Sequence, residues 1–350
     1  MSGYRVGVVG ATGAVGTTIL DVLTERGFPV AELVPFASER SAGRKLDFGD
    51  AEVECRPLAP DTIGGLDLVL SSAGGAISAE WAPRFIEAGA VVVDNTSYWR
   101  MHDDVPLVVA EVNPEAVADH NGLLANPNCS TMQAMVALAP IHRAVGIERI
   151  LFSTYQSVSG TGQSAVEELR EQSRAILNGD DPVAEVYPHP IAFNIVPHVE
   201  TFKDGDDYTT EERKMMAETR KILGASEQEM GISATCVRVP VFIGHSESVN
   251  IQTREALSPE DCRRLLAGAN GVLVVDSPDE ALYPLAREAA GRDEVLVGRI
   301  RRDPSHERCL NLWVVGDNLR KGAATNAVQV AEVLHERDLV RVPAGASFSA

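Results

Sequence analysis

Short apolar runs alternate with helical patterns through the first third of the chain. The strand-like runs lie at 4–9, 31–36, 66–71, 91–94 and 123–125, and the helical patterns begin at residue 14 and cover 78–88. Runs that are apolar at nearly every position are typical of parallel strands whose two faces are both covered by helices. We therefore predict an α/β fold with a doubly wound parallel sheet in this region.

The pattern changes after about residue 145. Strand-like runs at 149–156, 235–243, 248–254 and 310–315 are separated by charged turns, which indicates a mixed or antiparallel sheet. Helical patterns cover 130–145, 163–177, 210–223 and 323–337, and the tail from 340 is expected to fray. We predict two domains, one of residues 1–129 completed by a C-terminal helix within 317–338, and an α+β domain of residues 130–316 with the mixed sheet.

Composition excludes several classes of protein. The 350 residues carry 31 Lys+Arg against 50 Asp+Glu, a formal net charge of −19, which argues against nucleic acid and anionic membranes as partners. No 18-residue apolar stretch occurs and the glycine-interrupted start lacks a basic leader, so we predict neither a transmembrane helix nor a signal peptide. The five cysteines form no C-x-x-C pair, which favours reduced thiols in a cytoplasmic protein and no metal site.

A glycine-rich turn joins the first predicted strand to the first predicted helix. Gly10, Gly13 and Gly16 form a G-x-x-G-x-x-G motif there. In Rossmann-type folds such glycines let backbone N–H groups approach a dinucleotide pyrophosphate at a helix N-terminus. A tight turn without a ligand is the alternative interpretation.

The end of the second predicted strand bears on the choice of cofactor. Glu39 would favour the ribose diol of NAD, whereas Arg40 and Ser41 suit the 2′-phosphate of NADP. We predict NADP; the alternative for Arg40 is a solvated loop charge.

One cysteine differs from the other four in its surroundings. Cys129 lies in the polar sequence Asn-Pro-Asn-Cys-Ser directly before an apolar helical pattern. At a helix N-terminus the dipole and free N–H groups favour a thiolate and can stabilise an oxyanion. Cys129 is therefore a candidate nucleophile, with an inert small thiol as the alternative.

A histidine and an arginine flank one predicted strand end. His245 is a candidate acid or base, with a structural or solvated histidine as the alternative. On a continuous strand Arg238 and His245 would point to opposite faces. They converge only if the chain turns or bulges at Gly244, which glycine permits.

These motifs together resemble the aspartate-β-semialdehyde dehydrogenase family. The matching stretches are GATGAVG at 10–16, SSAGG at 71–75, DNTSYWR at 94–100, PLVVAEVN at 106–113, NPNCS at 126–130, YQSVSG at 155–160, AFNIVPH at 192–198, EERK at 211–214 and RVPVFIGH at 238–245. They run in order along most of the chain. The combination of NPNCS, YQSVSG and RVPVFIGH is far more specific than a glycine motif alone.

The resemblance implies a role for each matching residue. Cys129 corresponds to the acyl-thioester nucleophile and His245 to the acid/base. The implied substrate-binding residues are Arg238 for the α-carboxylate, Arg100 and Lys214 for the phosphoryl group, Gln156 to orient the substrate, and Asn128 to position the cysteine. The implied cofactor contacts are Gly10, Thr12, Gly13, Ala14, Val15, Arg40, Ser41, Ala73, Ser159, Gly160 and Asn318.

Two adjacent glutamates compete for the substrate amine. On a helix Glu211 lies three residues from Lys214 and shares its face, whereas Glu212 points about 200° away from Lys214. We therefore predict that Glu211 pairs with the amine.

The reaction implied by the resemblance is reduction of L-4-aspartyl phosphate by NADPH to L-aspartate 4-semialdehyde through a cysteine thioester. It belongs to the biosynthesis of lysine, methionine, threonine and isoleucine, and the family's second domain also forms a homodimer. The nearest alternative is N-acetyl-γ-glutamyl-phosphate reductase, which needs no group for a free amine. A non-catalytic NADP sensor is a further alternative, but it would not need the thiolate. A thiol-redox protein would need a resolving cysteine, and the sequence offers no obvious one.

Overall fold

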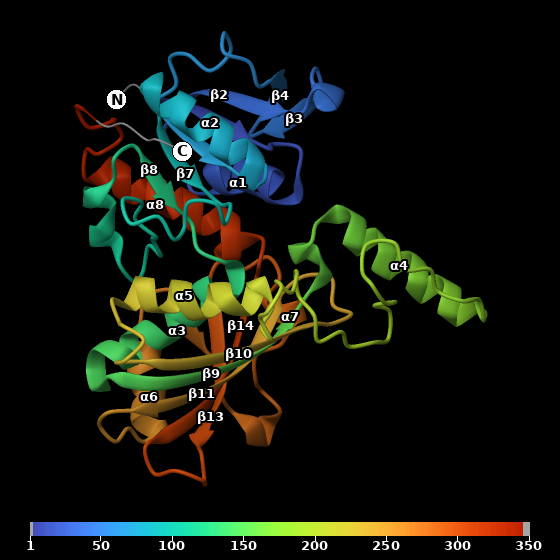
Figure 1. Cartoon of the computed structure of the whole chain (residues 1–350), viewed down its shortest axis with the longest axis vertical. Helices are drawn as coiled ribbons and strands as arrows, with labels where there is room; N and C mark the ends of the chain where they lie inside the picture. Colours follow the sequence, from blue (N-terminus) through green and yellow to red (C-terminus); the bar gives the residue numbers. More distant parts are fainter. Residues whose placement is uncertain (1–2, 346–350) are drawn as a thin grey trace. The chain divides into compact units, whose positions relative to one another are not determined.

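The computed structural model describes residues 3–345, and in it the chain forms two units. One unit extends to Asn128 and resumes at Ala323, and the other covers Cys129–Gly322. Each unit contains its own six-stranded sheet (Figure 1). Of the tail predicted to fray, residues 346–350 lie outside the described part of the chain.

All six strands of the first sheet are parallel, as the sequence predicts. Their order across the sheet is β5-β2-β1-β6-β7-β8. The strands are β1 (Tyr4–Val9), β2 (Val30–Ala37), β5 (Arg56–Pro57), β6 (Leu68–Ser71), β7 (Val91–Asp94) and β8 (Leu123–Ala125). The other elements are α1 (Ala14–Glu25), α2 (Gly75–Glu87), α8 (Thr325–Glu336), the short helices η1 (Glu39–Ser41) and η2 (Pro114–Asp119), and the hairpin β3 (Lys45–Phe48) and β4 (Ala51–Glu54).

Alternate side chains of these strands enter two different cores. Val6, Val8 and Leu68 are fully buried in a cluster with apolar residues of α1 and α8. On the other face Phe36 of β2 meets Phe85 of α2, with 5.8 Å between the ring centroids. Because helices cover both faces, the strands are apolar at nearly every position, which is the pattern that predicted a doubly wound sheet.

The second sheet is mixed, which also confirms the prediction. Its strands, in order across the sheet, are β10 (Gly231–Arg238), β9 (Ile147–Gln156), β11 (His245–Thr253), β14 (Cys309–Gly316), β13 (Val295–Arg302) and β12 (Val272–Val274). β9 is parallel to β10 and antiparallel to β11. The helices are α3 (Cys129–Val145), α4 (Gln163–Asn178), α5 (Thr210–Leu223), α6 (Pro259–Ala267) and α7 (Ala286–Ala289), with short turns η3 (Val158–Gly160), η4 (Pro278–Glu280) and the π-helical η5 (Arg320–Ala324).

Two predictions about this sheet were wrong or incomplete. The strand predicted over 235–243 ends at Arg238, because Pro240 offers no backbone N–H and Gly244 adopts a φ of +96°. The strands β12 and β13 were not predicted. A register shift between Gly298 and Arg301 interrupts the alternation that would have identified β13.

Four strand ends of the second sheet lie at one edge. β9 and β10 run parallel and end with Gln156 directly opposite Arg238. β11 runs the other way and begins at His245, which pairs with Gly316 at the end of β14. The topology therefore brings residues that are far apart in sequence to the same edge of one sheet.

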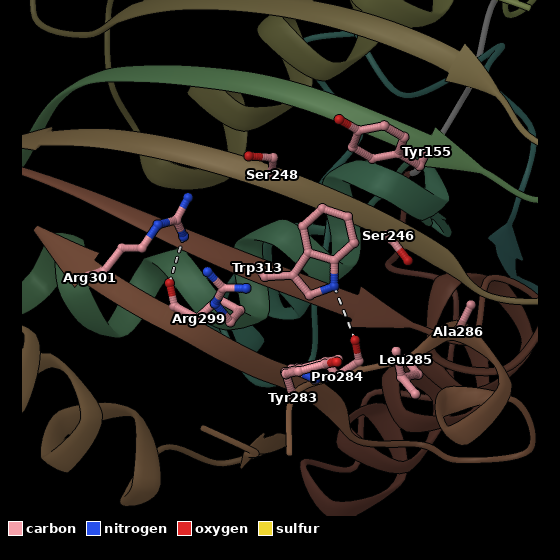
Figure 2. Close-up of a pocket in the computed structure, with 10 residues that line it drawn as sticks. All are labelled: Tyr155, Ser246, Ser248, Tyr283, Pro284, Leu285, Ala286, Arg299, Arg301 and Trp313. Carbon is pink, nitrogen blue, oxygen red and sulfur yellow. Dashed lines mark hydrogen bonds between the residues drawn. The ribbon is translucent and has the colours of Figure 1, made fainter. Parts of the chain in front are cut away.

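The two faces of this sheet carry different side chains. α3 and α5 pack on one face, and the opposite face presents Tyr155 and Trp313, whose ring centroids are 5.5 Å apart. A pocket of about 390 Å³ opens on that opposite face (Figure 2). Trp313 and Pro284 line it, and Trp313 Nε1 donates to the Pro284 carbonyl oxygen at 3.1 Å. Ser246 and Ser248 of β11 also line it. Because side chains alternate along a strand, these residues point away from Gln156 and His245.

Two absences concern the described residues 3–345. No helix there is long and apolar enough to cross a membrane. In the same residues, no three His, Cys, Asp or Glu side chains are grouped so that they could hold a metal ion.

Candidate active site

The glycine-rich loop connects β1 to α1 at the carboxyl end of the first sheet. Gly10 has a φ of +80°, and a Cβ atom at Gly16 would lie only 2.1 Å from the Gly10 carbonyl oxygen. Gly13 is exposed and caps α1 without a side-chain hydrogen bond. The N–H groups of the first helical turn are thereby left for an anion, and this cradle fits a dinucleotide pyrophosphate.

The other predicted cofactor residues of the first unit lie around this loop. Ala73, after β6, packs on it, because a Cβ atom at Gly10 would come within 3.2 Å of the Ala73 Cα. Arg40 and Ser41 form part of η1 directly after β2, the neighbour of β1, and Arg40 is exposed. The half-buried loop and helix positions are Thr12, Ala14 and Val15. Since β1, β2 and β6 are parallel, all these segments follow strand ends at the same edge.

Arg100 is held by backbone carbonyl groups of the first unit. Its Nε donates to the Asn126 oxygen at 2.9 Å and its Nη2 to the Asn95 oxygen at 2.8 Å. The loop that carries it folds around the buried carboxylate of Asp94, which accepts from the Thr96 backbone N–H at 2.8 Å and the Thr96 hydroxyl at 2.5 Å. The guanidinium is therefore fixed before any ligand binds.

Cys129 is the first residue of α3 and is partly exposed, and the preceding Asn128 is buried. Gly322 packs directly against the cysteine, because a Cβ atom at Gly322 would lie 2.9 Å from the Cys129 Cβ. A thiol at a helix N-terminus is favoured as thiolate. Burial instead raises the thiol pKa of each of the other four cysteines, Cys55, Cys236, Cys262 and Cys309.

His245 is fully buried at the start of β11. Its Nδ1 accepts from the Ser157 backbone N–H at 3.0 Å and lies 3.1 Å from the Ser157 hydroxyl. Burial, and secondly the charge of Arg238, hold the pKa of His245 well below its usual value, so the ring is neutral at neutral pH. Because Nδ1 accepts an N–H, the neutral ring carries its proton on Nε2, which has no hydrogen-bond partner among the described residues.

Arg238 ends β10 and is 5% exposed. Its Nη1 donates to the Ser157 carbonyl oxygen at 2.7 Å, and its guanidinium carbon lies 5.8 Å from the centroid of the Tyr187 ring. Its buried Nε has no hydrogen-bond partner within the described part of the chain. A buried, fixed arginine with an unsatisfied donor suits a ligand carboxylate.

The turn at Gly244 brings Arg238 and His245 together. A Cβ atom at Gly160 would lie 3.3 Å from both Arg238 Nη1 and His245 Nε2. The condition that the sequence set for their convergence is therefore met. Gly160 itself is exposed, and a side chain there would crowd both groups.

The two adjacent glutamates of α5 have different partners. Glu211 is buried and accepts from Gln156 Nε2 at 2.9 Å. Glu212 forms a capping box with Thr209 and accepts from the Cys236 backbone N–H at 2.9 Å. The carboxylate of Glu212 is thus satisfied by backbone groups, while Glu211 faces the strand-end edge.

Lys214 is engaged by two carboxylates. Its Nζ forms an ion pair with Glu200 and lies 3.6 Å from Glu211 Oε2. The side chain remains 22% exposed, so an anion from solvent can compete for it.

Asn318 joins the loop after β9 to the turn before β11. Its Oδ1 accepts from the Ser157 hydroxyl at 3.0 Å and from the Gly244 backbone N–H at 2.9 Å, and its Nδ2 donates to the Ser159 hydroxyl at 2.9 Å. These bonds fix the Gly244 turn and hence His245. The roles of Asn318, Ser159 and Gly160 as cofactor contacts stay predictions.

Comparisons with known proteins give the same family along nearly the whole chain. Residues 5–120 match the family described as "Semialdehyde dehydrogenase, NAD binding domain", and residues 138–321 match "Semialdehyde dehydrogenase, dimerisation domain". An aspartate-semialdehyde dehydrogenase of Aquifex aeolicus (strain VF5) is 54% identical over 342 residues, which cover 97% of this chain and 100% of the relative. The chain belongs to the aspartate-semialdehyde dehydrogenase family.

Other members of the aspartate-semialdehyde dehydrogenase family are also similar to this chain in sequence and in structure. A relative from Legionella pneumophila is 52% identical, with 97% of each chain covered. The crystal structure of aspartate semialdehyde dehydrogenase II from Vibrio cholerae has a TM-score of 0.92 and 48% identity over 95% of this chain and 99% of that one. A structure of that enzyme complexed with ASA has a TM-score of 0.93 and 47% identity over 96% and 99%.

Two residues of this family member's site were not singled out from the sequence. Ser157 binds His245 through its N–H and Arg238 through its carbonyl oxygen, and a backbone role of this kind leaves no mark on residue type. Gly322 makes room for Cys129, and a single glycine in the sequence does not indicate such a contact.

Proposed function

We propose that this chain reduces L-4-aspartyl phosphate to L-aspartate 4-semialdehyde and releases phosphate, a step in the synthesis of lysine, methionine, threonine and isoleucine. The names of its relatives and the Vibrio cholerae complex with ASA support this substrate. They do not favour the alternative, N-acetyl-γ-glutamyl-phosphate reductase.

The observation that carries the proposal is a pair of buried donors. Arg238 Nε and His245 Nε2 have no hydrogen-bond partners among the described residues, and both side chains border Gly160. A substrate with a carboxylate and a reacting acyl oxygen would supply both partners. Glu211, held on Gln156, would receive the substrate amine, which an N-acetylated substrate lacks.

Cys129 would act as the nucleophile. Its thiolate attacks the acyl carbon, a sulfur–carbon bond forms, the carbon–oxygen bond to the phosphoryl group breaks, and phosphate leaves. Arg100 and Lys214 would hold that phosphate. Nε2–H of His245 donates to the acyl oxygen whenever the carbon becomes tetrahedral, so that it stabilises the negative charge there.

The finer choice of NADP over NAD is part of the proposal. The family match gives a nicotinamide dinucleotide domain, and the Candida albicans enzyme, with 28% identity, a TM-score of 0.74 and coverage of 97% of this chain and 100% of that one, was solved with NADP. The loop Gly10–Gly16 would hold the pyrophosphate, and Arg40 with Ser41 the 2′-phosphate. A bound cofactor would supply the hydride that adds to the thioester carbon; the carbon–sulfur bond would then break, so that the aldehyde is released and Cys129 returns to its thiolate.

We also propose a homodimer formed by the second unit. The match to a dimerisation domain over residues 138–321 supports it. Tyr155 and Trp313 on the sheet face opposite α3 and α5 would be buried by the second copy.

A substrate panel tests the proposal. The purified chain is given aspartate semialdehyde or N-acetylglutamate semialdehyde, with phosphate and either NADP or NAD, and reduced cofactor is followed. We expect phosphate-dependent turnover of aspartate semialdehyde, with NADP preferred and the preference reduced in Arg40→Ala. Turnover of the acetylated substrate alone would overturn the substrate, and indifference to Arg40→Ala would overturn the 2′-phosphate contact.

A further inference from the structure

A buried glutamine joins the helix of Cys129 to the strand of His245. Gln133 lies one helical turn after Cys129 in α3. Its Nε2 donates to Glu247 Oε1 at 2.8 Å and to the His245 carbonyl oxygen at 3.2 Å. Glu247 lies two residues after His245, on the same face of β11. One side chain therefore ties the two elements that present the candidate nucleophile and the candidate proton donor.

Packing leaves this link little freedom. Gln133 is 1% exposed and Glu247 is fully buried. Gly316, which pairs with His245 in the sheet, would bring a Cβ atom within 2.8 Å of Gln133 Oε1. Only a glycine there lets the amide lie against β14. Close packing against Gly316 therefore also restricts Gln133 to the rotamer that makes its two hydrogen bonds.

Glu247 has ionisable neighbours on several elements. Glu211 of α5 and Cys236 of β10 face it, and His245 shares its strand. Burial raises the pKa of Glu247 well above its usual value, against an opposing effect of the Gln133 hydrogen bond, and the charge of Glu211 raises it further.

We propose that Gln133 and Glu247 are positioning residues, which fix the start of α3 relative to the start of β11. The proposal rests on the roles of Cys129 and His245 proposed above. Neither residue is assigned contact with the substrate. Both residues align Cys129 with His245, the two groups proposed to act on the substrate. Their loss should therefore lower turnover more than substrate affinity.

Five variants test the link: Gln133→Met, Glu247→Met, both together, Glu247→Gln, and Gln252→Met. The methionines keep length and remove the hydrogen bond, and Glu247→Gln keeps an uncharged acceptor. Gln252→Met is the matched control, because Gln252 Nε2 donates to Glu148 Oε1 at 2.5 Å near the other end of β11. Each protein is compared with wild type in kcat, in KM for aspartate semialdehyde, and in the rate at which iodoacetamide alkylates Cys129.

We expect Gln133→Met and Glu247→Met each to lower kcat about 10- to 100-fold, with KM changed less than about threefold. The double variant should lose no more than the worse single one, because both remove the same link. Alkylation of Cys129 should slow in all three. Glu247→Gln and Gln252→Met should stay within about threefold of wild type.

Several outcomes would overturn the link. These are additive losses in the double variant, an effect on KM instead of kcat, an unchanged rate of Cys129 alkylation in the methionine variants, or a loss in Glu247→Gln as large as in Glu247→Met. If a methionine variant does not fold, Gln133→Asn, which is one methylene shorter, takes its place with the same expectation. Alkylation needs no substrate, so it decides the link even if wild type fails to turn over aspartate semialdehyde, a result that would overturn the proposed function alone.

Discussion

The glycine loop of the first unit and the strand-end cluster of the second are built from different kinds of sequence information. The loop is one continuous segment, and its chemistry comes from backbone N–H groups that glycines leave accessible. The cluster takes Gln156, Arg238 and His245 from three different strands and depends on their side chains. The loop should therefore be sensitive to added volume, and the cluster to removed functional groups.

The largest effect should come from the second unit, at the cysteine that begins α3. Cys129→Ala removes the proposed nucleophile, so kcat should fall by about 10⁴-fold or more. Steady-state kinetics with aspartate semialdehyde, phosphate and NADP measure it. Cys309→Ala is the matched control, because that thiol is buried and its pKa is raised. Retained turnover in Cys129→Ala would remove the nucleophile from the site.

The loop should respond to a single methyl group. Gly16→Ala would place Cβ 2.1 Å from the Gly10 carbonyl oxygen, whereas Gly13→Ala would place it 3.3 Å away with a favourable φ of −81°. Overpacking of this kind costs about 1–3 kcal/mol, so cofactor affinity or the Tm should fall clearly in Gly16→Ala. Gly13→Ala should be much milder in both.

Titration calorimetry with NADP and a thermal melt compare these two variants directly. The reverse ranking, with Gly13→Ala the more damaging, would mean that cofactor binding depends on close approach of the cofactor at Gly13 more than on packing of the loop at Gly16. Equal, small effects would contradict the backbone cradle.

The same difference explains what the sequence could predict. The parallel sheet follows from local periodicity, the glycine loop from its motif, and the shared face of Glu211 and Lys214 from helical spacing; all three are present in the structure. The convergence of Arg238 and His245 was left open, because alternation along one strand cannot describe a chain that leaves the sheet at Arg238 and re-enters it at His245. Ser157 acts through its backbone, and Gln133 through a partner more than a hundred residues away, so neither carried a local signal.

A smaller effect should separate two adjacent glutamates of α5. Glu211→Gln removes the charge proposed to bind the substrate amine, so KM for aspartate semialdehyde should rise about tenfold or more. Glu212→Gln weakens a capping box and should cost about 1 kcal/mol of stability with KM unchanged. Kinetics and urea denaturation on both variants measure the contrast. A higher KM in Glu212→Gln alone would reverse the assignment.

The smallest effect concerns the pH dependence of stability. Two residues on one face of β11, His245 and Glu247, should change it in opposite directions. The folded-state pKa of His245 lies below its unfolded value of 6.5, so the stability it confers is present above pH 6.5 and is lost as pH falls. The folded-state pKa of Glu247 lies above its unfolded value of 4.5, so its contribution is lost as pH rises from there. Each proton changes stability by at most about 1.4 kcal/mol per pH unit.

Urea denaturation between pH 5 and 8 should therefore show opposite changes in two variants. His245→Gln should lessen the loss of stability toward pH 5, whereas Glu247→Gln should lessen the loss toward pH 8. Replacement of the exposed His189 by Gln should leave the profile of wild type. If both variants shifted the profile in the same direction, either the lowered pKa of His245 or the raised pKa of Glu247 would have to be abandoned.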